Sequence, residues 1–408
     1  MSEYQYVAFR AVDRPVDETN LEYMRRQSTR AEITPWSFEN EYHYGDFRGD
    51  PIQMVRRGYD IHLHYANFGI RKLLIRFPRG LAETISFEPY LEEGSLEFLK
   101  DEEGSGGILC VDPAYEPGDL EELWEIDAFL DRLIPLRAEI LDGDLRPLYV
   151  AHLAIVRDYE HDPEEAREAP IPAGLEALSD AQRALAELYG VSDELLAAAA
   201  EKSPPLPSLI DLNADRMKWI RAQTEATKNA WLAALLAEPG SAVRAEILAK
   251  CRTDRGITSW PTAPPTRTVA QLEATATEIA NESRQKAAAK AARERAKRLA
   301  DMATEPEATL RETQRLVAKR TAEAYSQIAD LLADLREALS GSRRADLAEN
   351  HAKKLKAANP TLRLLTRGTA PPRLCAEVIS RGAVGRALVG ALGRGDPGIR
   401  SDSLEPRP

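Results

Sequence analysis

The sequence contains few cysteines and no long apolar run. Cys110, Cys251 and Cys375 are odd in number and show no C-x-x-C spacing, which argues against a disulfide framework and against a thiolate zinc site. The longest apolar runs, such as residues 195–200, are too short to cross a bilayer, and residues 1–6 lack the basic and apolar regions of a signal peptide. We therefore expect a cytoplasmic protein without a membrane-embedded segment.

The common signatures of phosphate binding and of serine hydrolysis are also missing. Neither G-x-x-x-x-G-K-[ST] nor G-x-G-x-x-G occurs, and no nucleophile elbow is present. Residues 103–107 are rich in glycine, but no helical pattern follows them directly, so a hairpin turn is the better interpretation. The sequence leaves open whether the protein is an enzyme.

Aromatic residues and charge are unevenly distributed along the chain. Only five of the 26 Phe, Trp and Tyr residues lie beyond residue 160. Residues 1–270 carry 29 Lys and Arg against 48 Asp and Glu, a formal charge of −19, whereas residues 271–357 carry 17 against 14. Because an acidic surface repels phosphate, we expect any contact with nucleic acid to involve the C-terminal part.

The N-terminal 160 residues show the alternating and turn-bounded patterns of β-strands. Strands are predicted at residues 4–12, 60–65, 70–77, 85–90, 95–100 and 108–112. Within residues 30–44 the face that carries the apolar residues changes at Pro35, which predicts a bulge or two separate strands. Helices are predicted at residues 17–27, 51–57, 119–133 and 145–158. This order predicts an α+β domain with a mixed or antiparallel sheet and helices on one face.

The rest of the chain is expected to be all-α, with long helices. The prediction places a linker at residues 161–178, a helical subdomain at 179–260, a long-helix pair at 266–358 and a mostly disordered tail at 359–408. Residues 214–237 read as one helix, and the long-helix pair is divided near residues 304–306. In its second helix, apolar residues recur at steps of three and four, the seam of packed helices: Tyr325, Ile328, Leu332, Leu335 and Leu339.

The most specific chemical pattern is Asp60-Ile61-His62-Leu63-His64. The period of two in a strand places Asp60, His62 and His64 on one face, and His43 and Asp46 would join them if their strands were neighbours. Two imidazoles and carboxylates can bind a divalent transition metal that activates water for hydrolysis. The alternative is that these side chains form the hydrogen-bonded polar face of a sheet.

A second pattern is a basic stripe on the predicted long helix. At 100° per residue, Lys286, Lys290, Arg293 and Lys297 share one side, beside a narrow apolar seam that begins at Ala289. The stripe can neutralise phosphates without reading bases, and it can dock on an acidic protein or remain a solvated face.

Three N-terminal phrases carry a resemblance to a known family. They are YQYVAFRAVDRPV at residues 4–16, RAEITPWSFENEYHYGDF at 30–47 and GYDIHLHYANFG at 58–69. The chain resembles, over about residues 1–365, a family of bacterial proteins that share this N-terminal part and a helical C-terminal part. The resemblance implies a bacterial cytosolic protein and supplies no activity.

These observations favour an interaction or regulatory protein over an enzyme. We expect an α+β domain that displays an aromatic and histidine-rich face, coupled to helices that bind a protein partner or nucleic acid. The alternative is a metal-dependent hydrolase that uses Asp60, His62, His64, His43 and Asp46.

Overall fold

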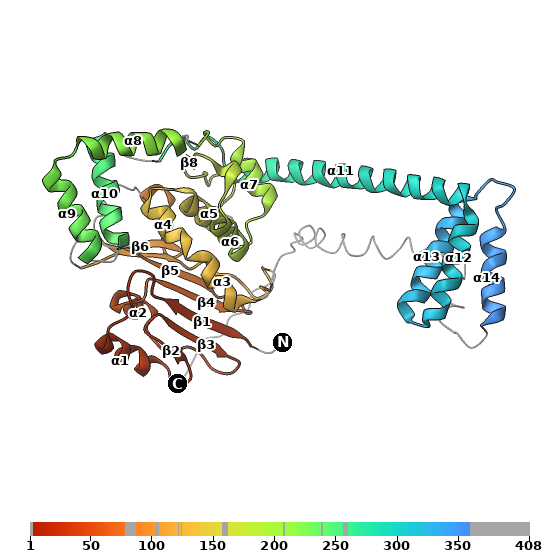
Figure 1. Cartoon of the computed structure of the whole chain (residues 1–408), viewed down its shortest axis with the longest axis horizontal. Helices are drawn as coiled ribbons and strands as arrows, with labels where there is room; N and C mark the ends of the chain where they lie inside the picture. The colour runs from red at the N-terminus through yellow and green to blue at the C-terminus, as the bar shows by residue number, and fades with distance from the viewer. Residues whose placement is uncertain are drawn as a thin grey trace, which may run out of the picture. The chain divides into compact units, whose positions relative to one another are not determined.

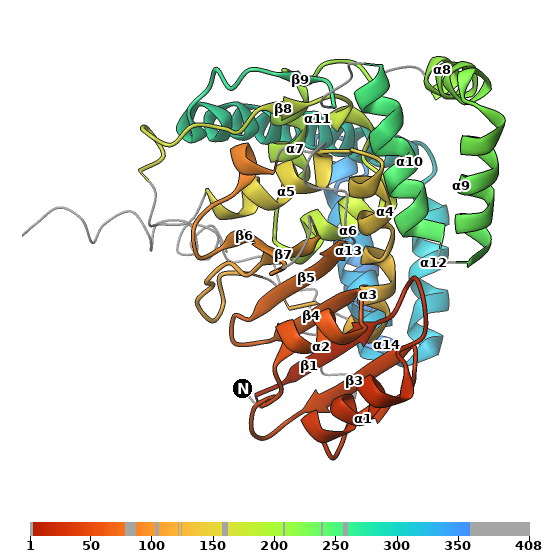
Figure 2. The ribbon, with the colours of Figure 1, turned by 90° about the vertical axis from the view of Figure 1, so that its left-hand side faces the viewer.

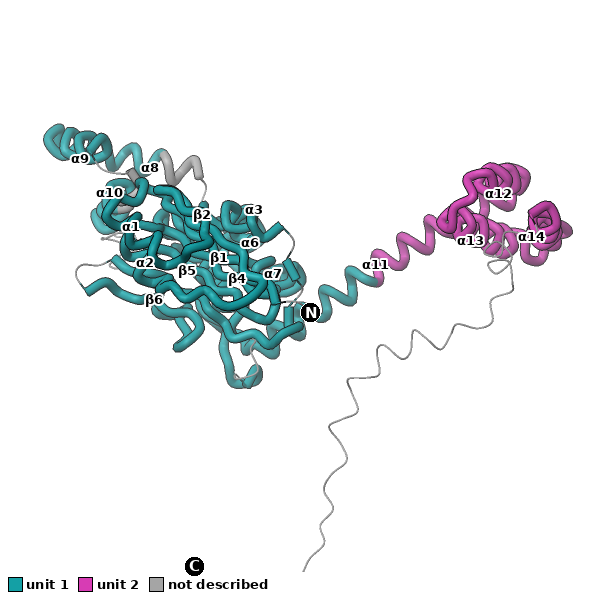
Figure 3. The backbone as a smooth tube through the Cα atoms, turned by 90° about the horizontal axis from the view of Figure 1, so that it is seen from below, with its two compact units in different colours: residues 1–284 teal, residues 285–408 magenta. Residues whose placement is uncertain are grey.

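The computed structural model describes residues 3–77, 87–102, 106–120, 122–123, 125–156, 162–206, 209–237, 240–255 and 260–359. The chain divides into two compact units, residues 1–284 and residues 285–408 (Figure 3). The predicted tail falls, apart from residue 359, outside the described residues.

Within the described residues, unit 1 is built on a seven-stranded antiparallel sheet (Figure 2). In chain order the strands are β1 (Gln5–Arg10), β2 (Glu32–Ile33), β3 (Ser37–Tyr42), β4 (Ile61–Ala66), β5 (Arg71–Phe77), β6 (Leu96–Lys100) and β7 (Gly107–Val111). Across the sheet their order is β2-β3-β1-β4-β5-β7-β6, and every neighbouring pair is antiparallel. The structure confirms the α+β class and selects the antiparallel alternative.

The predicted break at Pro35 is present, because β2 and β3 form a tight hairpin there. The Oγ1 atom of Thr34 accepts hydrogen bonds from the backbone N–H groups of Trp36 and Ser37, at 3.1 and 2.9 Å. Thr34 thus supplies the acceptor for the backbone N–H groups of the turn, at the point where Pro35, which has no N–H, interrupts the strand ladder.

The central strands are apolar on both sides. On β1, Val7 and Phe9 belong to one buried cluster, whereas Tyr6 and Ala8 belong to another on the opposite face. A sheet that is buried on both faces needs cover on both faces. The structure therefore differs from the expectation of helices on one face.

Two capped helices cover the first face. They are α1 (Glu18–Gln27) and α2 (Pro51–Arg57), both predicted from the sequence. The carboxylates of Asp17 and Asp50 accept hydrogen bonds from the N–H groups three residues later, the usual N-cap geometry. These helices bury Leu21, Met24 and Met54 against the sheet.

The second face is covered by a larger group of helices (Figure 1). They are α3 (Ile126–Leu133), α4 (Pro135–Leu141), α5 (Arg146–Ile155), α6 (Asp180–Leu188) and α7 (Asp193–Ala200). The predicted helix at 119–133 starts later than expected, and α4 was not predicted. The predicted strand at 85–90 is wrong for its described part, because Glu88–Tyr90 form the 3₁₀ turn η1 around Pro89, which cannot donate to a ladder.

The described part of the predicted linker is residues 162–178, and its residues 168–175 pack into the core, whereas residues 162–165 are exposed. Ile171, Ala173 and Leu175 are buried, and β8 (Ile171–Pro172) pairs with β9 (Thr262–Ala263). The 3₁₀ turn η2 (Leu175–Ala177) follows. The segment thus behaves as part of unit 1, and the domain boundaries drawn from the sequence remain a prediction.

Three helices follow: α8 (Leu209–Ala222), α9 (Glu225–Ala237) and α10 (Gly240–Asp254). The single helix predicted at 214–237 is wrong, since the chain breaks at Thr224. Its Oγ1 atom accepts from the N–H of Thr227 at 3.1 Å and so starts α9 as a new helix. Trp219 and Trp231 stack across the break, with ring centroids 5.3 Å apart.

The C-terminal helices begin with α11 (Val269–Thr304), which is continuous over 36 residues. Pro306 opens α12 (Pro306–Lys319), so the predicted division near residues 304–306 is confirmed. The second predicted helix divides again at Arg320, which has a φ of 52°, and Thr321 caps α13 (Ala322–Ala338). The helix α14 (Leu347–Ala358) completes the described part of unit 2.

The predicted apolar seam of α13 is buried. Ile328 and Leu335 are fully inaccessible, and the other three seam residues are at most 7% exposed. The seam packs against Leu355 of α14 and Met302 of α11. Within the described ranges, every helix is either too short or too polar to span a lipid bilayer.

Candidate functional site

His62 and His64 do project from the same side of β4, as the period of two predicts. His62 is completely buried, and its ring stacks on Phe9 with centroids 4.0 Å apart. Its Nδ1 atom lies 3.0 Å from the carbonyl oxygen of Ala8, while Nε2 has no hydrogen-bond partner among the described residues. Burial, aided by His64 and Lys72, lowers the pKa of His62 well below its usual value, so this imidazole is neutral.

His64 lies at the edge of the buried face and is tied to Asp46 through a glutamine. Its Nε2 atom lies 3.0 Å from Oε1 of Gln5, and Nε2 of Gln5 donates to the Asp46 carboxylate at 2.9 Å. Because an ionised carboxylate only accepts, Asp46 fixes the Gln5 amide, which must therefore present its oxygen to His64. His64 then carries its proton on Nε2, and Nδ1 is left as the acceptor.

Two further charged groups, Lys72 and Asp112, border His64 and were not among the site residues predicted from the sequence. Lys72 faces His64 in the β4–β5 register and forms an ion pair with Asp112 at 2.7 Å. Burial, followed by the charge of Lys72, lowers the pKa of His64 to about 4. A neighbouring ammonium group also opposes the binding of a second cation. The period of two along β1 and β5 would have placed Gln5 and Lys72 on this face.

Asp60 is occupied by structural contacts. Its carboxylate accepts hydrogen bonds from the N–H groups of Val12 and Asp13, at 2.6 and 3.1 Å. Arg137 lies 3.5 Å from the same carboxylate and donates to both oxygens of Asp13. Burial raises the pKa of Asp60, while Arg137 and the backbone donors act in the opposite direction. Asp60 therefore fixes the end of β1 against β4 and α4.

His43 lies apart from the other two histidines. Its ring contacts Tyr4, at 5.5 Å between centroids, and Tyr4 packs against the core on the opposite face of the sheet. The strand β1 also separates β3 from β4. Within the described residues, no group of three or more His, Cys, Asp or Glu side chains is placed to hold a metal ion. The structure brings together His62, His64 and, through Gln5, Asp46, and leaves His43 and Asp60 elsewhere.

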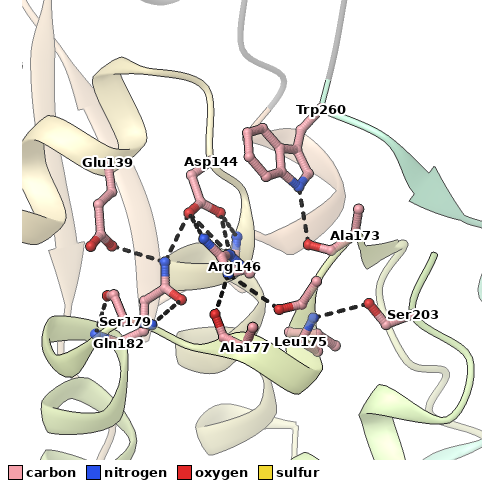
Figure 4. Close-up of polar contacts among 11 residues, drawn as sticks. Glu139, Asp144, Arg146, Ala173, Leu175, Ala177, Ser179, Gln182, Ser203 and Trp260 are labelled. Carbon is pink, nitrogen blue, oxygen red and sulfur yellow. Dashed lines mark hydrogen bonds and ion pairs between the residues drawn. The ribbon is translucent and has the colours of Figure 1, made fainter. Parts of the chain in front are cut away.

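A second polar network lies among the helices α4, α5 and α6 (Figure 4). Arg146 donates from Nε and Nη2 to the Asp144 carboxylate at 2.6 to 3.0 Å, and from Nη1 to the carbonyl oxygen of Ala177 at 2.7 Å. The Gln182 amide donates to both Asp144 and Glu139. These bonds join α4, α5 and α6 to residues 174–177 and hold that part of the predicted linker in place.

A third network is an ion pair in the core. Arg267 donates two hydrogen bonds of 2.8 Å to the Glu168 carboxylate, and the hydroxyl of Tyr149 donates a third at 2.5 Å. Arg267 also donates to the carbonyl oxygen of Ala198 at 2.8 Å. The carboxylate and guanidinium are each bonded to several groups, as buried charges must be, and the network holds α5, α7 and the start of α11 together.

The basic stripe predicted from the sequence lies on the most exposed segment of α11. Residues 281–298 are all exposed. Lys286, Lys290, Arg293 and Lys297 occupy an arc of about 60° and extend over about 16 Å of the helix. Within the described part of the chain, Lys290, Arg293 and Lys297 have no ion-pair partner.

The opposite side of the same helix is fixed to α13. Arg298 donates to the Asp334 carboxylate at 2.7 Å, and Arg295 donates to Asp334 and Glu337 at 3.3 and 2.7 Å. By helical periodicity Arg295 lies about 170° and Arg298 about 110° from the centre of the stripe. The stripe therefore faces away from the bundle, toward solvent.

Comparison with known proteins gives no further assignment, since no family model matches the chain and no curated protein or solved structure is significantly similar to it.

Proposed function

We propose that this chain is a bacterial cytoplasmic interaction protein that binds the phosphate backbone of a nucleic acid. The contact is the cationic stripe of α11, formed by Lys286, Lys290, Arg293 and Lys297. The observation that carries the proposal is the exposure of this stripe on a helix whose other side is held by the Arg295 and Arg298 ion pairs.

The composition of the exposed segment favours a phosphate backbone over a protein surface. Affinity between proteins depends on a few large anchors, most often aromatic side chains or arginine in desolvated pockets. The apolar residues beside the stripe are small, namely Ala289, Ala292 and Ala296. Binding to phosphates needs no apolar anchor, because the release of counterions drives it.

The charge distribution supports the same assignment. Residues 1–270 carry a formal charge of −19 and repel a polyanion, which favours an approach of the nucleic acid to the C-terminal part of the chain, where the stripe lies. No aromatic residue occurs between residues 261 and 324, so the segment offers no platform on which bases can stack. Binding should therefore be independent of sequence.

The experiment is fluorescence anisotropy with a labelled single-stranded oligonucleotide of mixed sequence and its duplex. The variant replaces Lys286, Lys290, Arg293 and Lys297 with alanine, which raises helix propensity and preserves the fold. The control removes the same charge elsewhere in unit 2, by replacing Arg343, Lys353, Lys354 and Lys356 with alanine.

The proposal predicts that the wild-type chain binds the oligonucleotides at about 50 mM salt. The affinity of the stripe variant should be at least about tenfold lower, and the control variant should keep the wild-type affinity. If both variants bind equally, the contact lies elsewhere. Should neither oligonucleotide bind while an acidic polypeptide such as poly-glutamate does, the stripe serves an acidic protein instead.

A further inference from the structure

The middle of α11 is a stretch of helix that packs against neither core of the described chain. Toward the N-terminal end of α11, Leu272 and Ala276 are buried in the core of unit 1, and toward its C-terminal end Met302 is buried in the core of unit 2. Residues 281–294 lie between these anchors and before the ion pairs of Arg295, and every one of them is exposed. At 1.5 Å per residue they form about 21 Å of helix that is open to solvent on all sides.

The charge of this stretch is unsuited to a helix that only spans a distance. Residues 284–298 carry seven Lys and Arg side chains against one acid, Glu294. An isolated helix is stabilised by opposite charges at i and i+4, whereas Lys286 and Lys290 place like charges at that spacing. Because a bound polyanion removes this repulsion, the charge favours a ligand over a solvated spacer.

The helix carries basic side chains on two flanks, with alanine between them. At 100° per residue, Ala289 and Ala292 lie about 100° from the centre of the stripe, and Arg284 lies about 110° beyond the alanines on their other side. The opposite face between the two flanks carries Glu294, which repels phosphate. The alanine face is therefore the one that suits an anionic ligand with two walls of charge.

We propose that the nucleic acid bound by this chain is double-stranded DNA and that residues 281–294 lie in its major groove. This inference rests on the proposed function and adds the form of the nucleic acid. The major groove of B-form DNA is about 12 Å wide and about 8.5 Å deep, and an α-helix with its side chains is about 10 to 12 Å across.

The alanine face gives the helix the shape that the groove requires. With Ala289 and Ala292 toward the floor, the helix is narrow enough to enter, and its two basic flanks face the phosphates of the two strands. Alanine has no hydrogen-bonding group for the base edges, so insertion does not require a particular sequence.

Other forms of nucleic acid do not offer such a groove. The major groove of A-form RNA is deep and narrow and does not admit a helix, and a single strand has no second wall of phosphates. A diffuse attraction between the stripe and phosphates would instead treat DNA and RNA duplexes alike. The form of the nucleic acid therefore separates groove insertion from attraction to the backbone alone.

The test measures the affinity of the full chain for three ligands of the same mixed sequence: a DNA duplex of about 20 base pairs, or two helical turns, the matching RNA duplex and one DNA strand. Binding is measured by the anisotropy of a dye on the nucleic acid. The alanine-face variant is Ala289→Glu, and the matched control is Ala287→Glu, also at an exposed position. The two positions lie about 70° and about 90° from the centre of the stripe, on opposite sides of it, so electrostatics alone weakens both variants about equally.

The wild-type chain should bind the DNA duplex at least about tenfold more tightly than the RNA duplex or the single strand. Ala289→Glu should lower the affinity for the DNA duplex at least about tenfold, and Ala287→Glu should lower it less than about threefold. Equal binding of the two duplexes, or equal losses in the two variants, would overturn groove insertion while phosphate binding stands. A wild-type chain that binds none of the three ligands would contradict the proposed function together with this inference.

Discussion

The histidine cluster of the sheet predicts a defined response of stability to pH, best tested with His64→Gln. The pKa of His64 is lowered to about 4 in the folded chain, against an unfolded value of about 6.5. Between these values the unfolded chain binds a proton that the folded chain refuses. The contribution of neutral His64 to the free energy of unfolding is therefore fully present above about pH 6.5 and is lost as the pH falls toward 4.

At pH 5 the proton on unfolded His64 costs the fold about 2 kcal/mol, whereas at pH 7.5 the cost is close to zero. Glutamine places an N–H where His64 has Nε2–H, so it can keep the hydrogen bond to Gln5 without titrating. We expect His64→Gln to change the free energy of unfolding by less than about 1 kcal/mol at pH 7.5. At pH 5 the effect of the substitution should be more stabilising than at pH 7.5 by about 2 kcal/mol.

The assay is hydrogen–deuterium exchange of peptides from β1 and β4, which reports the opening of this sheet directly. Wild type and variant are compared at the same pH, so that intrinsic exchange rates cancel. The matched control is His43→Gln, since the His43 side chain is 61% exposed and lies outside the cluster. The gain in protection of the His64→Gln variant over wild type should be larger at pH 5 than at pH 7.5. An equal gain at both pH values would refute the assignment of His64 as a neutral, desolvated imidazole.

Three further predictions concern the framework of unit 1. Arg267→Met leaves the buried Glu168 carboxylate without its counter-ion and should lower unfolding free energy by about 3 to 5 kcal/mol, measured by urea denaturation; the double variant with Glu168→Leu should recover part of that loss. Gly69→Ala should cost more than about 1 kcal/mol in the same assay, because Gly69 has a φ of +119° and a Cβ would meet the carbonyl oxygen of Tyr115 at 2.2 Å. Zinc or manganese added at micromolar concentration should not raise the melting temperature of unit 1, and a stoichiometric increase would show that the histidines do bind a metal.

The local patterns of the sequence predicted the individual elements well. The helices predicted at residues 17–27 and 51–57 and the period of two along β4 depend only on neighbours in the chain, and the structure confirms them. The helix breaks at Thr224 and Arg320 were missed, because neither position carries the glycine or proline that usually marks such a break.

The candidate site shows where local patterns stop being informative. The sequence correctly placed His62 and His64 on one side of β4, but it could not give the lateral order β3-β1-β4, which keeps His43 away from them. Likewise, nothing in the spacing of Gln5 and Asp46 reveals that they meet across 41 residues. These contacts depend on how strands pair over long separations, which is a property of the whole sheet.

The most direct test of the proposed function is the dependence of nucleic-acid affinity on salt. Four phosphate contacts predict that the logarithm of the binding constant falls with the logarithm of salt concentration with a slope of about −2.8 for a single strand and about −3.6 for a duplex. Replacing Lys286, Lys290, Arg293 and Lys297 with alanine should bring that slope close to zero. A wild-type slope near zero, or a steep slope that survives in the variant, would contradict the account.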